Sequence, residues 1–250
     1  MIDVLVVGAA GRMGALTAAT VSAQGDLRLV AEVDPAFGTD ASEGRYPDLA
    51  AALSATHPAV AVEFSTPATV AANAKTLLSA GVDTIVGATG LDEAAVEALS
   101  RTAAATRARL LIVPNFSLGA VLMMRFAAEA ARYLTRAEII EIHEESKLDA
   151  PSGTSLRTAR LMADAGAQGR DGGDESPPAR GLGAGPVRIH SLRLPGVVAH
   201  QEVVFGGVAE TLTIRHDSLA RESFMAGTLL AIRHLSELEG TVVGLENLIR

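Results

Sequence analysis

Short apolar segments alternate with helix-like segments along the first 115 residues. Apolar, β-branched runs predict strands at residues 2–7, 27–33, 59–65, 83–89 and 109–115. Helical patterns lie between them, at residues 11–23, 67–80 and 91–107. Strands that alternate with helices form a parallel sheet, and strands this apolar are buried on both faces. The pattern therefore predicts an α/β fold whose N-terminal part is a doubly wound parallel sheet.

The pattern changes after residue 116. Helices are expected at 118–134 and 154–165, and strands at 137–143, 187–194, 197–205 and 208–216. Before the strand at 187–194, residues 164–186 are polar and rich in Gly and Pro, which predicts a loop longer than an ordinary connector. Strands grouped in this way indicate an α+β domain with a mostly antiparallel or mixed sheet. A last helix, at 218–235, is expected to pack back on the first domain, so we divide the chain into 1–115 completed by 217–250, and 116–216.

Composition narrows the range of functions. Of 250 residues, 48% are apolar and 20% charged, as in a folded globular protein. A net charge of −8 and an aromatic content of 3% argue against binding to nucleic acid or to a membrane surface. The absence of Cys excludes disulfides and thiolate metal sites, and we predict no metal. With neither a secretory signal nor an apolar run of about 18 residues, a cytoplasmic protein is expected.

A glycine-rich turn, "GAAGRMG", directly follows the first strand and opens the first helix. Gly8, Gly11 and Gly14 would permit a tight turn and a close approach of the backbone to a ligand. The free N–H groups of the helix N-terminus would bind a pyrophosphate. The spacing differs from the usual G-x-G-x-x-G, so a purely structural turn stays open as the alternative. Its position after the first strand of an α/β domain favours a Rossmann-like dinucleotide site.

Asp34 ends the second strand, about 20 residues beyond the glycine turn, where a carboxylate accepts from an adenosine ribose hydroxyl. A carboxylate there repels a 2′-phosphate, and no base adjoins it because Pro35 follows. We therefore predict that NADH serves at least as well as NADPH. A solvated aspartate at a strand end is the alternative. The loops 63–67, 87–90 and 113–117 also follow strands, where the nicotinamide would lie.

The segment "HEESKLDAPSGT", residues 143–154, combines one His and one Lys with several acids. Ser152, Gly153 and Thr154 stand at a predicted helix N-terminus, which makes an uncharged anion site. Lys147 adds a positive charge, and His143 can exchange a proton near neutral pH. The set suits a carboxylate substrate and a proton-transfer step, although a capped helix beside a solvated strand end would also account for it.

This segment and its flanks resemble the signature of the dihydrodipicolinate reductase family. The pattern E-x-x-E-x-H-x-x-x-K-x-D-x-P-S-G-T is met throughout residues 138–154, and "GAAGRMG", "EFSTP", "GATG", "VPNFSLGA" and "AHQEVVFG" also look like family segments. The resemblance implies reduction of 4-hydroxy-tetrahydrodipicolinate to tetrahydrodipicolinate, on the route to diaminopimelate and lysine, with hydride from NADH or NADPH. It also implies that the second domain binds a small dicarboxylate and builds a homotetramer.

The resemblance assigns roles to individual residues. His143 would act in proton transfer and Lys147 as general acid, and Gly153 and Thr154, with Ser152, would bind a substrate carboxylate. The residues expected at the cofactor are Gly8, Ala9, Ala10, Gly11, Arg12, Met13, Asp34, Gly87, Ala88, Thr89, Val113, Pro114, Asn115 and Phe116.

Glu144 is the clear departure from the family, which commonly has a second His there. We place it among the substrate-binding positions, but an ionised Glu facing a dicarboxylate would be repelled by several kcal/mol if desolvated. We expect its side chain to turn away; weakened affinity or a different substrate are the alternatives. Two other functions stay open: a Rossmann reductase of another carboxylate, and a dinucleotide sensor without catalysis.

Overall fold

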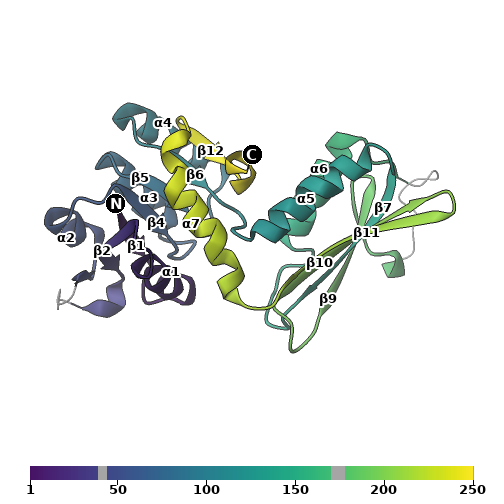
Figure 1. Cartoon of the computed structure of the whole chain (residues 1–250), viewed down its shortest axis with the longest axis horizontal. Coiled ribbons are helices and arrows are strands. Elements are labelled where there is room, and N and C mark those ends of the chain that lie inside the picture. The colour runs from purple at the N-terminus through teal and green to yellow at the C-terminus, as the bar shows by residue number, and fades with distance from the viewer. Residues whose placement is uncertain (39–43, 170–177, 250) are drawn as a thin grey trace. The chain divides into compact units, whose positions relative to one another are not determined.

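The structure is a computed structural model that describes residues 1–38, 44–169 and 178–249 (Figure 1). The chain divides into two compact units. Unit 1 comprises Met1–Phe116 and Phe224–Arg250, and unit 2 comprises Ser117–Ser223. Each unit has its own sheet and its own apolar core.

Unit 1 contains a parallel sheet that has seven strands within the described residues. They are β1 (Ile2–Val7), β2 (Leu27–Val33), β3 (Arg45–Tyr46), β4 (Val60–Glu63), β5 (Asp83–Val86), β6 (Leu110–Ile112) and β12 (Thr241–Val243). Their order is β12-β6-β5-β4-β1-β2-β3, and every pairing is parallel. Winding reverses between β1 and β4, so the carboxyl ends of these strands form the topological switch point. The predicted doubly wound sheet is confirmed.

Helices cover both faces of this sheet. In the described part of unit 1 the α-helices are α1 (Arg12–Ser22), α2 (Leu49–Ala55), α3 (Val70–Ser79), α4 (Glu93–Thr106) and α7 (Met225–His234). Leu5 and Val7 of β1 belong to one core cluster with Leu49 of α2. Val4 and Val6 point to the opposite face, because side chains alternate along a strand, and both are fully buried. Burial on both faces is why the strands read as almost continuous apolar runs.

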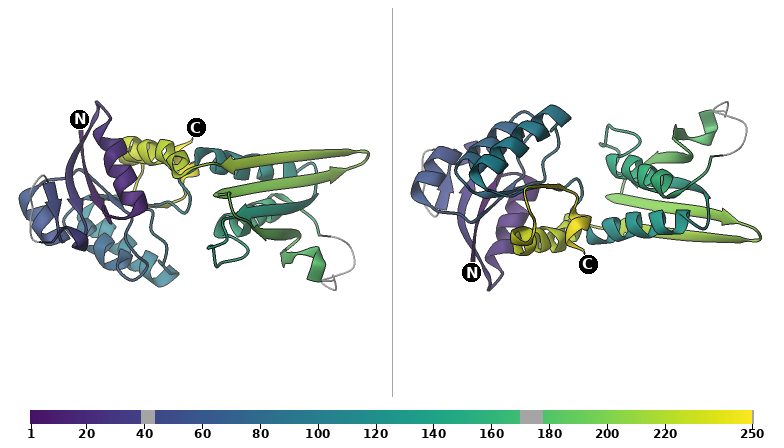
Figure 2. Two further views of the ribbon diagram at one scale, coloured as in Figure 1. Left: turned by 90° about the horizontal axis from the view of Figure 1, so that it is seen from below. Right: turned by 90° about the horizontal axis from the view of Figure 1, so that it is seen from above.

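Unit 2 contains a mixed sheet of five strands within the described residues. They are β7 (Arg136–His143), β8 (Leu182–Ala184), β9 (Val187–Arg193), β10 (Ala199–Gly207) and β11 (Glu210–Ser218), in the order β11-β10-β7-β9-β8. β7 and β9 are parallel, and the other pairings are antiparallel. Figure 2 shows the two longest strands, β10 and β11, side by side at one edge. This confirms the predicted mixed sheet.

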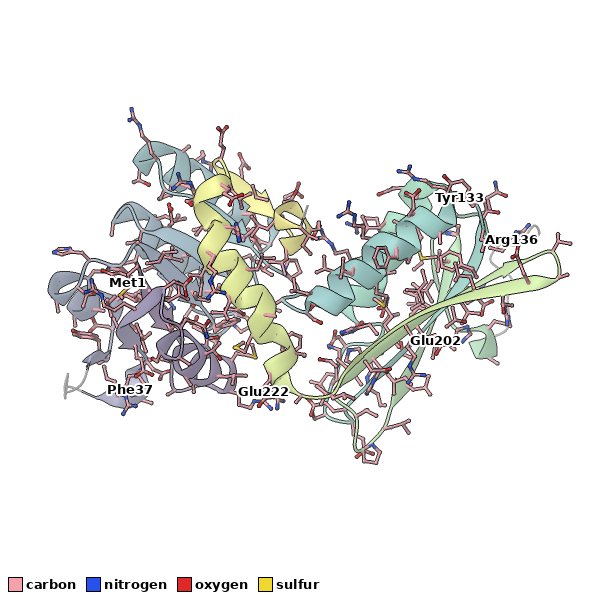
Figure 3. All side chains as sticks on the ribbon, viewed as in Figure 1. Met1, Phe37, Tyr133, Arg136, Glu202 and Glu222 are labelled. Atoms are coloured by element: carbon pink, nitrogen blue, oxygen red, sulfur yellow. The ribbon has the colours of Figure 1, made fainter. Side chains whose placement is uncertain are left out.

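Two helices, α5 (Leu118–Ala131) and α6 (Gly153–Ala165), cover one face of the unit 2 sheet. Ile139 of β7 and Phe205 of β10 point to that face and pack in one core cluster with Ala127 of α5 and Met162 of α6. Tyr133 lies just beyond α5 and is 78% exposed (Figure 3). The described residues also form 3₁₀ turns, namely η1 (Pro35–Phe37), η3 (Pro178–Arg180), η4 (Arg221–Phe224), η5 (Leu235–Glu237) and η6 (Leu245–Leu248).

Several element boundaries differ from the prediction. The helix predicted from residue 67 begins at Val70, because Thr66 first closes a turn in which its carbonyl accepts from the N–H groups of Thr69 and Val70. The helix predicted from residue 218 begins at Met225, since β11 continues to Ser218 and η4 follows. The short elements β3, α2 and β12 were not predicted, because too few residues display a period.

The predicted loop at 164–186 is partly wrong. Its first two residues end α6, and residues 178–184 form η3 and the edge strand β8. β8 pairs antiparallel with β9, and this pairing supplies the backbone hydrogen bonds of β8. The side chains of so short a Gly-containing segment form no pattern that predicts a strand. The central part of that prediction, residues 170–177, lies outside the described residues.

Candidate active site

The glycine turn of unit 1 leaves no room for a Cβ at Gly8 or Gly14. Gly8 has a φ of +74°, and a Cβ on it would lie 2.6 Å from the carbonyl oxygen of Phe64. A Cβ on Gly14 would lie 2.0 Å from the carbonyl oxygen of Gly8. The turn joins β1 to α1 at the switch point, so the glycines bring the backbone close to β4 as a dinucleotide cradle requires.

The N-terminus of α1 is open to an anion. Its N-cap is Gly11, which has no side chain to cap the helix, and its first turn contains no acid. Arg12 and Met13 begin the helix, and their N–H groups precede any intrahelical acceptor. Ala9 is buried and Ala10 exposed in the same turn. These features fit a pyrophosphate at the helix N-terminus.

Asp34 connects the end of β2 to the glycine turn. Its Oδ2 accepts from the N–H of Ala10 at 3.2 Å, and its Oδ1 accepts from the N–H of Ala36 at 2.9 Å. Each oxygen of a carboxylate can accept more than one hydrogen bond, so Asp34 keeps capacity for a ribose hydroxyl. Two backbone bonds therefore hold the carboxylate beside the glycine turn.

Two further predicted loops meet at the same edge of the sheet. Gly87 and Ala88 both donate from their N–H groups to the carbonyl of Glu63, at 2.9 and 3.2 Å. A Cβ on Gly87 would lie 2.3 Å from the ring of Phe64 and 2.6 Å from that of Phe116. The two rings pack with centroids 5.4 Å apart. Glycine at this position therefore lets the aromatic pair close over the loop.

The remaining predicted cofactor residues follow β5 and β6. Val113 is buried and donates to the carbonyl of Val86 at 2.9 Å. Pro114 is exposed, Asn115 is partly buried, and Thr89 is exposed after β5. The parallel register brings these loops to the carboxyl edge of the sheet that also carries the glycine turn.

Glu63 is a buried acid that the sequence analysis did not single out. Its side chain has no exposed surface, and its Oε1 accepts from the N–H and hydroxyl of Ser65 and from the amide of Asn73 at 3.1 Å. Oε2 is buried and, among the described residues, has no hydrogen-bond partner. Burial raises the pKa of this carboxyl, against the hydrogen bonds from Ser65 and Asn73, which lower it. Its position at the end of the predicted strand region was the only signal in the sequence.

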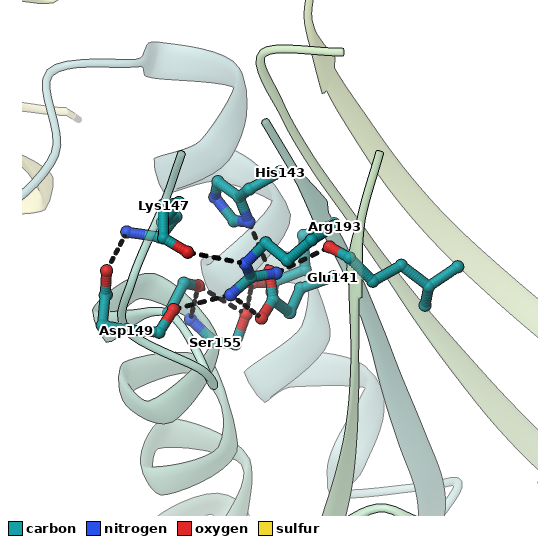
Figure 4. A network of polar contacts seen from close by, with 9 residues as sticks. Glu141, His143, Lys147, Asp149, Ser155 and Arg193 are labelled. Carbon is teal, nitrogen blue, oxygen red and sulfur yellow. Dashed lines mark hydrogen bonds and ion pairs between the residues drawn. The ribbon is translucent and has the colours of Figure 1, made fainter. Parts of the chain in front are cut away.

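In unit 2, a buried network connects β7 to β9 (Figure 4). Glu141 and His143 stand two residues apart on the inner face of β7, and the Nδ1 of His143 is hydrogen-bonded to the Glu141 carboxylate. Arg193 of β9 donates two bonds to the same carboxylate, each 3.0 Å long. Burial raises the pKa of Glu141, but bonds from His143, Arg193 and Ser191 outweigh burial and lower it to about 2. Glu141 is therefore ionised at neutral pH.

Lys147 follows β7 in a short irregular segment. Its Nζ donates to Oδ1 of Asp149 at 2.7 Å, and the bond from Lys147 lowers the pKa of that aspartate. Arg193 donates to the carbonyls of Lys147, at 3.3 Å, and Asp149, at 2.6 Å. The Arg193 guanidinium thus supports His143 through Glu141 and supports Lys147 through its carbonyl (Figure 4).

The predicted anion cradle is the N-terminus of α6. Ser152 is 2% exposed and its hydroxyl accepts from the N–H of Ser155, so this hydroxyl serves as the helix cap. Ser155 in turn donates to Gln201, which donates to Thr158. The neighbouring Gly153 is exposed, and the space where its Cβ would lie is open.

Glu144, the departure from the family pattern, extends toward Arg221. Its carboxylate lies 3.7 Å from the guanidinium, and both side chains are partly exposed. This places a cation, not another acid, next to Glu144.

No helix in the described ranges is long and apolar enough to cross a membrane. The same ranges contain no group of three or more His, Asp or Glu side chains placed to hold a metal ion.

Comparison with known proteins places the chain among relatives along its full length. Residues 2–116 match the family description "Dihydrodipicolinate reductase, N-terminus", and residues 119–249 match "Dihydrodipicolinate reductase, C-terminus". A 4-hydroxy-tetrahydrodipicolinate reductase from Moorella thermoacetica is 44% identical over 270 aligned positions, covering 99% of this chain and 98% of the relative. One from Nocardia farcinica is 45% identical over 254 positions, covering 98% and 97%.

Among solved structures, the dipicolinate-bound dihydrodipicolinate reductase from Paenisporosarcina sp. TG-14 is similar to the whole chain. Its TM-score is 0.87 at 35% sequence identity, and the match covers 99% of each chain.

Proposed function

This chain belongs to the dihydrodipicolinate reductase family, and we propose that it reduces 4-hydroxy-tetrahydrodipicolinate to tetrahydrodipicolinate with NADH or NADPH, in diaminopimelate and lysine biosynthesis. One structural observation supports this activity in addition to membership of the family. His143, Lys147 and the N-terminus of α6 are supported by one buried network, so a proton donor, a cation and an anion cradle stand together in unit 2. The two alternatives, a reductase of another carboxylate and a dinucleotide sensor, are not favoured.

The cofactor residues proposed are those of the glycine turn, Asp34 and the loops after β5 and β6. The tight approach at Gly8 and Gly14 and the uncapped start of α1 support a pyrophosphate there. The bound nicotinamide would supply the hydride. The Phe64–Phe116 pair and Gly87 would shape the edge of the pocket that receives the ring.

NADH is proposed to serve at least as well as NADPH. The Asp34 carboxylate is held by Ala10 and Ala36 beside the glycine turn, where it would accept from a ribose hydroxyl and repel a 2′-phosphate. The dissociation constants of both dinucleotides, measured by quenching or enhancement of nicotinamide fluorescence, check this preference. An affinity for NADPH about tenfold or more above that for NADH would contradict it.

A carboxylate of the substrate is proposed to bind at the start of α6. Gly153 and Thr154 would donate from the backbone, Lys147 would supply the positive charge, and Ser152 would support the site by capping the helix. Glu144 is proposed to stay with Arg221, which removes the repulsion that an unpaired carboxylate would exert on a dicarboxylate.

Proton transfer is proposed for His143 and Lys147. The Nδ1 of His143 faces the ionised Glu141, which leaves Nε2 to exchange a proton. Lys147 would be the general acid that donates to the substrate as the hydride adds. Its Nζ lies 2.7 Å from Asp149 Oδ1, and this salt bridge orients the ammonium group.

A homotetramer is proposed through the face of the unit 2 sheet opposite α5 and α6. Ile140 and Ile142 of β7 and Val204 of β10 point to that face and are only partly buried. Leu192 of β9 alternates to the same face and is 37% exposed. An apolar stripe on a sheet face that carries no α-helix among the described residues is suited to packing against another copy.

The reductase assay follows oxidation of NADH and NADPH with substrate made in situ from pyruvate and aspartate semialdehyde by the preceding synthase. Lys147→Ala is expected to lower kcat/KM by about 100-fold or more, the usual effect of removing a general acid. Lys75→Ala is the matched control, because the sequence has two lysines and Lys75 is exposed on α3. No turnover of wild type despite NADH binding would favour the sensor, and an unaffected Lys147→Ala would remove Lys147 from the chemistry.

A further inference from the structure

Arg193 lies beside the proposed proton donors, yet its guanidinium is fully used by the protein. Nε donates to the carbonyl of Lys147 at 3.3 Å. Nη1 donates to Glu141 Oε2 at 3.0 Å and to the carbonyl of Leu192 at 2.6 Å. Nη2 donates to Glu141 Oε1 at 3.0 Å and to the carbonyl of Asp149 at 2.6 Å. A guanidinium has five N–H donors, and all five have acceptors here, so none remains for a substrate carboxylate.

Glu141 is the buried counterpart of this guanidinium. Its side chain has no exposed surface, whereas the side chain of Arg193 is 19% exposed. The planar guanidinium binds both carboxylate oxygens, which fixes the orientation of the carboxylate as well as its position. One of those oxygens, Oε2, also faces Nδ1 of His143. The orientation of the carboxylate therefore decides which imidazole nitrogen carries the hydrogen.

The segment between β7 and α6 depends on the same pair. Residues 144–152 contain no helix or strand, and the backbone bond from Lys147 to Glu144 closes only one turn. Arg193 binds two carbonyls of this segment, those of Lys147 and Asp149. These bonds limit where the Cα of Lys147 can lie, and hence where its ammonium can reach.

We propose that Glu141 and Arg193 act together as positioning residues, which hold His143 in its Nδ1–H tautomer and Lys147 at a fixed reach, and that Arg193 is not a substrate ligand. The inference deepens the proposed function and rests on it for the kinetic part of the test. Neither residue exchanges a proton with the substrate in this scheme. Their contribution is to the geometry of the two groups that do.

The kinetic test uses the paired apolar replacement Glu141→Leu/Arg193→Met. Replacing a buried ion pair by apolar side chains of similar size usually preserves folding, so it separates positioning from stability. We expect kcat to fall about 100-fold, as misplaced catalytic groups do. The Kd for NADH should stay within twofold of wild type, since the proposed dinucleotide site lies in unit 1. A kcat within threefold of wild type would overturn the inference.

Two further variants provide an independent test and a control. Arg193→Lys retains the charge opposite Glu141 but has only three donors, so the carbonyls of Lys147 and Asp149 lose partners. It is expected to fold even where the paired replacement does not, and to lower kcat at least tenfold; full activity would also overturn the inference. Arg160→Ala, at an exposed position on α6, is the matched arginine control and should behave as wild type.

The tautomer of His143 gives a readout that needs no turnover. In protein labelled with ¹⁵N at histidine, NMR at a pH where the ring is neutral should show Nδ1–H for His143 in wild type. The paired replacement should show a mixture. Wild type with Nε2–H would overturn the inference even if the reductase is active, whereas Nδ1–H in a protein without reductase activity would leave the positioning of His143 supported and the proposed function refuted.

Discussion

At the scale of single residues, two buried carboxyl groups have pKa values shifted in opposite directions. Glu141 and Glu63 both lack exposed surface, and burial raises the pKa of each. Around Glu141, a guanidinium and an imidazole outweigh burial. Around Glu63, the donors are the neutral groups of Ser65 and Asn73, and burial prevails. The charge of the partner, not the depth of the site, decides the sign.

Glu141 should stabilise the protein at neutral pH and cease to do so in acid. Its pKa of about 2 lies below the ordinary 4.5, so the stabilisation is complete above pH 4.5 and is lost as the pH falls toward 2. The amount is on the order of 3 kcal/mol. Chemical unfolding of wild type and Glu141→Gln across this range checks it, because the variant should lose less stability on acidification.

Glu97→Gln is the control for this measurement. Glu97 is 71% exposed and pairs with Arg101 one turn away on α4. Its removal should leave the pH dependence of wild type almost unchanged, since exposed pairs contribute little. Parallel pH curves for wild type and Glu141→Gln would contradict the prediction.

Glu63 should have the opposite effect. Its pKa is raised in the folded state, so the folded protein holds this proton more tightly than the unfolded chain does. Ionisation of Glu63 therefore costs stability as the pH rises through 4.5 toward the folded pKa. The stability of Glu63→Gln relative to wild type should increase over that interval and then level off. A difference that does not vary with pH would show that Glu63 ionises as freely in the folded protein as in the unfolded chain.

At the scale of elements, the starts of α1 and α6 differ in a way that matches their proposed ligands. α1 begins after Gly11, which provides backbone donors and no side chain. α6 begins after Ser152, whose hydroxyl satisfies one N–H of the first turn. A pyrophosphate needs close access to a bare helix end, whereas a carboxylate can bind at a capped one that a lysine supports.

Gly14→Ala should weaken dinucleotide binding. Its Cβ would lie 2.0 Å from the carbonyl oxygen of Gly8, so the turn must open and its N–H groups move. We expect the Kd for NADH to rise about tenfold or more, which corresponds to ~1.4 kcal/mol. Titration followed by nicotinamide fluorescence measures this.

Gly25→Ala is the matched control. An added Cβ at Gly25 would meet nothing within 4 Å, so the same substitution adds a methyl without closing the turn. Equal affinities of the Gly14 and Gly25 variants would mean that the tightness of the turn is irrelevant to the cofactor.

At the scale of the whole molecule, the two units are built differently. Unit 2 is one continuous stretch, whereas unit 1 combines the N-terminal part with the C-terminal residues that supply α7 and β12. α7 packs on α1, with the Thr17 hydroxyl 4.0 Å from the Met225 sulfur. In unit 2, α5 and α6 cover one face of the sheet, and the proposed tetramer would use the opposite face.

Ile142→Arg should dissociate the proposed tetramer. Ile142 points away from α5 and α6, between the inward-facing Glu141 and His143, and a charge there cannot be buried against another copy. Light scattering after gel filtration should give a mass near four times 25.7 kDa for wild type and a smaller mass for the variant. Tyr133→Arg, at an exposed position just beyond α5, should keep the wild-type mass (Figure 3). A tetramer that survives Ile142→Arg would exclude this face.

The sequence by itself determined the fold class, most of the long elements and the glycine turn, because these depend on local spacing. Apolar runs such as "IDVLVV" and the repeat of glycines after them require no knowledge of distant residues. It also showed that His143, Lys147 and "PSGT" lie together, because a segment of only twelve residues contains them all.

Only the tertiary structure decided which groups support that site. Arg193 is 52 positions from Glu141, and the two meet because β7 and β9 pair in parallel with His143 opposite Arg193. Likewise, Glu63 resembles any acid at the end of a strand until α3 brings Asn73 to it. Partners of this kind depend on strand register and helix packing between distant segments, and a local pattern of apolar and polar residues does not contain that information.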